Sequence, residues 1–325
     1  MQVFRLALIA TGTTVLLGWA AAVWFSSEPD IVDIREHLAK TAPPGKPVIG
    51  YATTDTLIFV TETLVDKPGG FMANDVLPPF SMMDNMAAWE LGALEMVRDM
   101  SLAMRRDFSR SQSQSMENEL LKQIQPKFNI DYRSWAVPTP ESEYSDALKL
   151  LRVYRQALSD PKSNEHQFYA RADNLREWLL AVEKRLGSYS QRLSASVGQD
   201  RLNTDLAGDI SARQSTISPE AYMMKTSWFR IDDEFYEARG AAWALLHFLK
   251  AVEIDFADVL ERKNATVSLQ QIIRELEATQ QTVWSPMVLN GSGFGLMANH
   301  SLVMANYISR ANAALIDLSD LLSKG

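Results

Sequence analysis

The stretch LREWLLAVEKRLGSYSQRLSASV, residues 175–197, indicates most clearly how this chain folds. Its apolar residues recur at alternating intervals of four and three: Leu175, Leu179, Val182, Leu186, Tyr189, Leu193 and Val197. This spacing is a heptad seam of about three heptads, typical of a long helix with coiled-coil-like packing. The seam can pack within one chain or pair two copies, and neighbouring helices of similar length favour packing within the chain.

The rest of the sequence continues the helical pattern. Helical periodicity of the apolar residues is found in four further segments: residues 48–66, 81–110, 232–283 and 296–322. Thr139-Pro140-Glu141 is a typical helix start, with an N-cap hydroxyl, proline at the first helical position and an acid near the helix N-terminus. Convincing alternation with a period of two is absent from the sequence. We therefore expect an all-α fold, built as a bundle of long antiparallel helices.

Residues 124–140 interrupt this pattern with three prolines. A loop of this length inside a compact body is uncommon and is sometimes functional. It is also the candidate boundary between two subdomains. Its residues Tyr132, Arg133 and Trp135 are of the types that anchor protein interfaces. We expect instead that Trp135 pins the loop to the bundle, since a large aromatic side chain is usually buried.

The N-terminal segment LALIATGTTVLLGWAAAVWF, residues 6–25, contains no charged residue. Its twenty residues would span about 30 Å as a helix, which is the hydrocarbon thickness of a bilayer. Aromatic residues near its end lie where a transmembrane helix meets the interface. The alternative is a signal peptide cleaved near residues 20–22. We expect a retained anchor, because only Arg5 precedes the apolar run and two large aromatic residues closely follow the candidate cleavage site.

The chain is accordingly divided into an anchor (residues 1–27), a polar tether (28–47) and an extracytoplasmic helical domain (48–325). Arg5 precedes the apolar segment, and the next basic residue after it is Arg35. Because basic residues flank membrane spans on the cytoplasmic side, we expect a cytoplasmic N-terminus with the bulk of the chain outside the cytoplasm.

Composition excludes several function classes. The chain has 325 residues, a net charge of −8 and a pI near 5.2, so it lacks the positive surface that nucleic-acid binding requires. It has no cysteine, which excludes disulfides, thiol nucleophiles and iron–sulfur clusters.

The segment NGSGFGLMANHSL, residues 290–302, concentrates glycine: Gly291, Gly293 and Gly295 lie within five positions. No strand precedes it, as a dinucleotide-binding loop requires, and no Lys-Ser/Thr follows, as a P-loop requires. Asn290 occupies the first glycine position of a G-x-S-x-G nucleophile motif. We expect a turn between two helices, whose Ser292 and Phe294 could contact a ligand or a partner.

His300 follows this turn on the apolar face of the next helix, so we expect a core histidine held by hydrogen bonds. A rival interpretation is a ligand or catalytic site that combines His300 and Arg310 with the glycine turn at residues 290–296. No partnered nucleophile is recognisable beside them.

One stripe of the helix expected over residues 232–262 is polar: Asp233, Glu237, His247, Asp255, Asp258 and Arg262. Carboxylates with a histidine could bind zinc or iron. The E-x-x-H spacing of di-iron bundles and the H-E-x-x-H of metalloproteases are both absent from the sequence. We therefore expect this stripe to face water, and we expect no metal and no other cofactor.

Several long strings are familiar: DKPGGFMANDVLPP (66–79), DFSRSQSQS (107–115), FYARADNLREWL (168–179), RLSASVGQDRLNTDLAGD (192–209), IDDEFYEARG (231–240) and residues 272–318. On these strings the chain resembles the uncharacterised proteobacterial family catalogued as domain of unknown function 2333. The resemblance covers nearly everything after the tether. It implies a bacterial, membrane-anchored protein, and it implies no activity and no catalytic residue.

These observations favour an inner-membrane protein whose periplasmic body is a non-enzymatic scaffold or adaptor. Its expected partners are the bilayer, through residues 6–25, and an envelope protein or a second copy of the chain, through residues 175–197. The alternative function is an envelope enzyme or small-molecule-binding protein with a site near His300 and residues 290–296.

Overall fold

The computed structural model describes residues 2–43, 47–77, 83–111, 115–160, 166–202, 221–285 and 287–324. The helices in chain order are α1 (Gln2–Phe25), α2 (Ile34–Thr41), α3 (Tyr51–Asp66), α4 (Asp84–Ala103), α5 (Glu119–Phe128), α6 (Pro140–Leu158), α7 (Ala172–Ser194), α8 (Ile231–Asp255), α9 (Ala257–Arg262), α10 (Thr266–Thr279) and α11 (His300–Ser323). The shorter elements are the π-helix η2 (Met104–Phe108), the 3-10 helices η3 (Ala195–Val197) and η4 (Trp228–Arg230), and the strands β1 (Gln199–Leu202) and β2 (Ala221–Met224).

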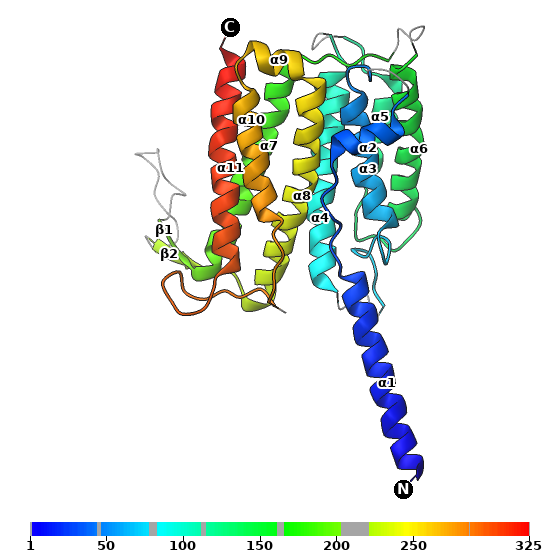
Figure 1. Cartoon of the computed structure of the whole chain (residues 1–325), viewed down its shortest axis with the longest axis vertical. Coiled ribbons are helices and arrows are strands. Elements are labelled where there is room, and N and C mark those ends of the chain that lie inside the picture. Colours follow the sequence, from blue (N-terminus) through cyan, green and yellow to red (C-terminus); the bar gives the residue numbers. More distant parts are fainter. Residues whose placement is uncertain are drawn as a thin grey trace, which may run out of the picture.

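The long helices form a bundle around α4 and α8, with α7, α10 and α11 on one side and α3, α5 and α6 on the other (Figure 1). Helices α4 and α8 start at the same end and run parallel to each other, so the expected antiparallel arrangement is wrong for this central pair. Helix α1 projects alone from one end of the bundle, which we call the proximal end, and the opposite end is the distal end. The expected all-α class is confirmed. The antiparallel ribbon β1–β2 at the proximal end is too short to change it.

Helices α4 and α8 make the most extensive contact in the bundle, and two glycines allow it. A Cβ atom on Gly92 would lie 1.9 Å from the carbonyl oxygen of Glu237. A Cβ atom on Gly240 would lie 2.0 Å from the carbonyl oxygen of Trp89. Real atoms cannot approach so closely, so only glycine permits this helix–helix distance.

Helix α7 buries the predicted seam against other helices of the same chain, chiefly α11. Six of its seven positions are buried, and only Val197, beyond the helix end, is partly exposed. The structure therefore shows the seam packed against helices of the same chain. Self-association through these six positions would require the bundle to open.

The expectation that the polar stripe of α8 faces water is wrong for its central part. His247 is fully buried and Asp255 is nearly so, while Asp258 and Arg262, beyond the end of α8, are exposed. The physical reason is that polar groups elsewhere in the chain cover the stripe. Asp255 accepts hydrogen bonds from the backbone N–H groups of Gly50 (2.9 Å) and Thr53 (2.7 Å), at the start of α3.

The predicted tether lies on α8 over its described part. The Glu28 carboxylate pairs with Arg239 at 2.6 Å, and Val32 N–H donates to His247 Nε2 at 3.1 Å. Helix α2 buries Ile34 and Leu38 against the bundle. These residues therefore belong to the folded body, and residues 44–46 of the predicted tether lie outside the described part of the chain.

Several predicted boundaries differ from the observed ones. Helix α5 continues through Phe128, so the irregular part of residues 124–140 is confined to 129–139. The predicted helix over 232–283 is broken after Asp255 and again before Thr266. Whether residues 124–140 separate two subdomains stays a prediction.

The last helix begins at His300 instead of residue 296. The side chain of Asn299 accepts a hydrogen bond from the backbone N–H of Leu302 at 2.8 Å, so Asn299 is the N-cap. Residues 296–299, which were predicted to belong to this helix, belong to a hairpin.

Within the part of the chain that the structure describes, no helix is both long and apolar enough to cross a membrane. The side chains of residues 6–8, which belong to the predicted span, lie outside that part.

Candidate functional site

The glycine-rich segment forms a hairpin, residues 289–300, between α10 and α11. Gly291 N–H donates to the carbonyl oxygen of Ala298 at 3.0 Å, and Asn299 Nδ2 donates to the carbonyl oxygen of Gly291 at 2.6 Å. A Cβ atom on Gly291 would lie 2.4 Å from the carbonyl oxygen of Met297, so this position requires glycine. The glycines thus turn the chain between two helices.

The tip of this hairpin presents apolar side chains to solvent. Gly295 N–H donates to the carbonyl oxygen of Ser292 at 2.8 Å and closes the tip. Phe294 and Leu296 are fully exposed. Ser292, Gly293 and Gly295 therefore shape a projecting apolar tip, and whether it contacts a ligand or a partner stays a prediction.

His300 is half-buried beside a small cavity of about 160 Å³. Its Nδ1 accepts from the backbone N–H of Leu289 at 3.1 Å, so the imidazole holds the base of the hairpin. The other polar groups of the cavity include Arg239 and Tyr307, and none of the described residues that line it is a carboxylate. Arg239 is paired with Glu28, so its charge is not free to bind a ligand in the cavity.

Arg310 does not join His300. It forms an ion pair with Glu275, and its ring partner is Tyr307, 5.4 Å from the guanidinium carbon. The cavity beside His300 does not include it. The structure therefore separates the two residues that the rival interpretation places together.

Loop 129–139 exposes the residues singled out in the sequence. Arg133 stacks on the Tyr132 ring at 5.3 Å. Trp135 is exposed over 73% of its surface, so it does not pin the loop to the bundle. The expectation of a buried Trp135 is wrong, because the loop is held by other contacts, such as that from Asn74 Nδ2 to the carbonyl oxygen of Ser134 (3.2 Å).

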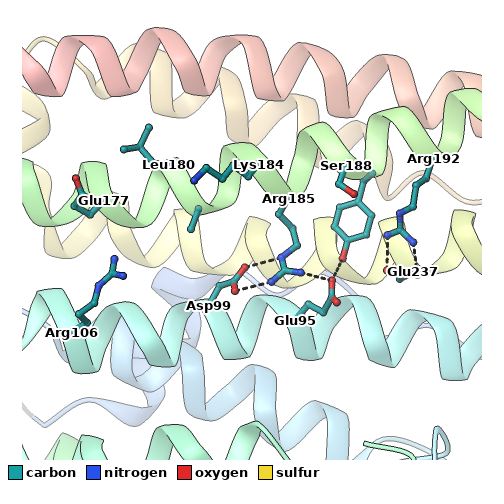
Figure 2. A pocket seen from close by; sticks show the side chains of 12 residues that line it. Glu95, Asp99, Arg106, Glu177, Leu180, Lys184, Arg185, Ser188, Arg192 and Glu237 are labelled. Carbon is teal, nitrogen blue, oxygen red and sulfur yellow. Dashed lines mark hydrogen bonds and ion pairs between the residues drawn. The ribbon is translucent and has the colours of Figure 1, made fainter. Parts of the chain in front are cut away.

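A larger hollow, which the sequence did not reveal, is a groove of about 680 Å³ between α4, α7 and α8 (Figure 2). Twelve side chains line it: Glu95, Asp99, Arg106, Glu177, Leu180, Ala181, Lys184, Arg185, Ser188, Tyr189, Arg192 and Glu237. Its volume is within the range of small-molecule sites, so its charges decide what it can do.

Arg185 is the first of two arginines that cross the groove from α7. Its Nε and Nη2 contact the two carboxylate oxygens of Asp99, each at 2.8 Å, and its Nη1 lies 2.9 Å from Glu95 (Figure 2). The Tyr189 hydroxyl donates to the same Glu95 carboxylate at 2.7 Å. Burial and then the charge of Glu95 raise the pKa of Tyr189 well above its ordinary value, so this hydroxyl stays protonated.

Arg192, two helical turns further along α7, repeats the arrangement with α8. Its Nη2 contacts Glu237 at 2.6 Å and its Nη1 contacts Glu234 at 2.6 Å. Its guanidinium carbon also lies 4.9 Å from the centre of the Tyr189 ring. The two arginines and Tyr189 thus brace α7 against α4 and α8.

The groove is therefore braced by paired charges. A ligand would have to displace these ion pairs, or use the residues at the rim, such as Lys184 and Glu177. The sequence held a partial signal, since Arg185 and Arg192 stand seven positions apart and Glu95 and Asp99 four, so each pair shares a helix face. Only the bundle shows that these two faces meet.

Among the residues that the structure describes, no group of three or more histidine or acidic side chains is placed to hold a metal ion.

Together the fold and these surfaces define an all-α bundle with a projecting N-terminal helix, braced by charge pairs and carrying apolar loops at one end. Residues 1–325 match the family described as an uncharacterized protein conserved in bacteria, DUF2333, and the chain belongs to that family. No curated protein and no solved structure matches the chain.

Proposed function

We propose that this protein is a membrane-anchored envelope protein of bacteria whose helical body acts as a non-enzymatic scaffold or adaptor. The observation that carries the proposal is α1, which leaves the body as a single helix with its apolar side chains exposed (Figure 1). Leu16, Leu17 and Trp19 each expose about two-thirds of their surface. Apolar surface of this extent is unfavourable in water and requires a cover.

The cover we propose is the bilayer of the inner membrane. Residues 6–25 carry no charge, Arg5 precedes them, and Glu28, Asp30 and Asp33 follow. This flanking charge supports a cytoplasmic N-terminus and a periplasmic body. The family to which the chain belongs is described as conserved in bacteria, which is compatible with an envelope location.

The character of the body supports a scaffold. The groove's arginines and carboxylates pair with one another, and His300 holds the hairpin, so these groups are already engaged. Meanwhile Trp135 and Phe294 stand exposed on separate loops. Exposed aromatic residues of this type suit contact surfaces better than they suit chemistry. Partner contact through such loops leaves the buried seam of α7 undisturbed.

A small-molecule or catalytic role at His300 is the alternative. The cavity of about 160 Å³ is below the usual 300–1,000 Å³ of ligand sites, which disfavours it.

Two experiments test the proposal. Membrane fractionation and protease accessibility in spheroplasts should place the full chain in the membrane fraction with its body cleaved from the periplasmic side. A Leu16→Arg, Leu17→Arg variant should lose membrane retention, whereas Val267→Arg, in the first turn of α10, should keep it. Release of the unaltered protein by lysis alone would contradict the anchor.

The scaffold is tested by cross-linking in intact cells, followed by mass spectrometry of what copurifies with the full chain. We expect a reproducible envelope partner that is lost on Trp135→Ala. Recovery of the protein alone, together with a small molecule that depends on His300, would contradict the scaffold and favour the alternative.

A further inference from the structure

We propose that the proximal end of the bundle is a second membrane contact, which dips apolar side chains into the interface of the bilayer that holds α1. This inference rests on the proposed anchor. The residues concerned, which we call the proximal face, come from the segment before α8 and the segment between α10 and α11: Trp228, Phe229, Trp284, Met287, Phe294 and Leu296.

These side chains are far more exposed than large apolar residues usually are. Phe229 exposes 85% of its surface and Trp284 92%, and Phe294 and Leu296 are fully exposed. Single exposed apolar residues are common, but a gathering of six with four aromatic rings is not. A surface of this kind indicates something that covers it.

Both segments lie at the end from which α1 projects. η4 directly precedes the start of α8, and residues 280–299 join the end of α10 to the start of α11. Figure 1 shows those helix ends at the proximal end of the bundle. The face and the anchor therefore point the same way.

The connection between α1 and the body is too short to hold them apart. Phe25, the last residue of α1, packs against the core and lies beside Gly69, where an added Cβ would be 3.3 Å from its ring. Glu28 is already paired with Arg239 of α8 at 2.6 Å. Only Ser26 and Ser27 intervene, and a chain that short reaches about 10 Å at most. With α1 in the bilayer, the proximal end lies at its surface.

The hairpin holds its tip in a defined position. Hydrogen bonds between Gly291 and Ala298 and between His300 and Leu289 close its base. Phe294 and Leu296 project beyond these bonds and contribute nothing to them. The tip can therefore enter an apolar layer without loss of an internal contact.

The residue types of the proximal face favour lipid as the surface that covers it. Tryptophan and phenylalanine at the level of the headgroups are typical of membrane interfaces. Asp84, Asp232 and Asp233 begin α4 and α8 at the same end, and the whole chain carries a charge of −8. An anionic lipid surface is not attracted to such a charge. The contact is therefore apolar insertion, independent of anionic lipid.

The absence of cysteine from the chain permits a direct test with single labels. Phe294→Cys and Phe229→Cys, on separate segments, carry an environment-sensitive fluorophore in full-length protein reconstituted into phosphatidylcholine vesicles. Val267→Cys at the distal end is the matched control, since Val267 is also well exposed. Leu16→Cys in α1 reports the anchor. All four side chains are exposed, so replacement leaves the core intact, which circular dichroism checks.

At positions 294 and 229 we expect blue-shifted emission and fluorescence quenching by lipids spin-labelled near the headgroup. At position 267 we expect neither effect. Quenching at position 16 by lipids spin-labelled at the end of the acyl chain, with no headgroup quenching at 294 and 229, would overturn the docking face and leave the anchor intact. No quenching at position 16 by the acyl-chain label would overturn the anchor itself. Quenching at 294 that requires phosphatidylglycerol would overturn apolar insertion.

Discussion

Helices α7 and α8 lie in the same bundle and are of similar length, yet they are built on different plans. Helix α7 has one buried apolar seam and one charged face, and that face forms a wall of the groove (Figure 2). Helix α8 is buried on nearly all sides, and polar residues such as Arg239 and His247 are buried with it. An amphipathic pattern locates a helix at the surface, whereas a central helix is specified by contacts that are distant in sequence.

The glycines of the two helices provide the strongest test of this difference. Gly240→Ala on α8 should lower the free energy of unfolding by more than about 3 kcal/mol, because its Cβ would meet a backbone carbonyl that cannot yield. Gly187→Ala on α7 is the matched change, since its Cβ would lie 3.7 Å from Asn312. It should be neutral or stabilise by up to about 1 kcal/mol. Urea denaturation of the full chain compares them, and equal effects would contradict the close α4–α8 contact.

Lowering the pH should reduce the free energy of unfolding through protonation of His247 in α8. Burial lowers the pKa of His247 to about 4, and its hydrogen bond to the carbonyl oxygen of Trp243 only partly opposes this, while Lys250 and His37 lower it further. The unfolded chain takes up this proton near pH 6.5, before the folded chain does. The stabilisation is therefore complete above pH 6.5 and is lost as the pH falls to about 4, by about 3 kcal/mol.

The difference in unfolding free energy between the natural chain and His247→Gln, measured across this range, isolates the effect. The difference is needed because Asp255, whose pKa burial raises to about 6, gives a slope of opposite sign. Tyr189→Phe on α7 should leave the acid part of the profile unchanged. A constant difference between pH 4 and 7 for His247→Gln would contradict a buried neutral imidazole.

An arginine on each helix gives the next comparison. Arg239→Met on α8 should cost about 2 kcal/mol, because it leaves Glu28 and the carbonyl oxygens of Thr279 and Gln281 without their donor. Arg185→Met on α7 should cost about 1 kcal/mol, since this pair is partly exposed to solvent. Thermal unfolding at low and high salt compares the two. A larger loss of stability at Arg185, or a stronger salt dependence at Arg239, would contradict this order.

The smallest effect is expected for a single hydroxyl in the groove. Tyr189→Phe removes the donor to Glu95 and should cost about 0.5 kcal/mol, because Arg185 still satisfies that carboxylate. Ser188→Ala, which lies in the same groove, is the control and should be near neutral. Urea denaturation measures both. A loss well above that of Arg185→Met would show that the hydroxyl, instead of the guanidinium, holds α7 to α4.

The parts of the fold that the sequence predicted are those whose signal lies in one segment. The four–three spacing from Leu175 to Leu193 places a buried seam correctly, because neighbouring turns of a helix share a face. The glycine turn at 290–296 is equally local. His247 and Asp255 were assigned to water because their partners, Val32 and Gly50, lie more than two hundred positions away.

The candidate sites follow the same division. Residues of the hairpin tip were identified from glycine spacing alone, whereas the groove needed α4 and α7 to be neighbours. Trp135 was expected to be buried on the strength of its size, yet the loop is held by Asn74 instead. In this loop the large aromatic side chain lies exposed at the surface, and Phe294 in the hairpin tip is exposed in the same way.

The glycine contact between α4 and α8 also constrains assembly of the chain. A slip of one residue between the helices is a shift of about 1.5 Å with a rotation of about 100°. It would place Leu91 or Ala93 where Gly92 now meets the Glu237 carbonyl, and only glycine fits there. The two glycines therefore specify the one register in which α4 and α8 pack at this distance.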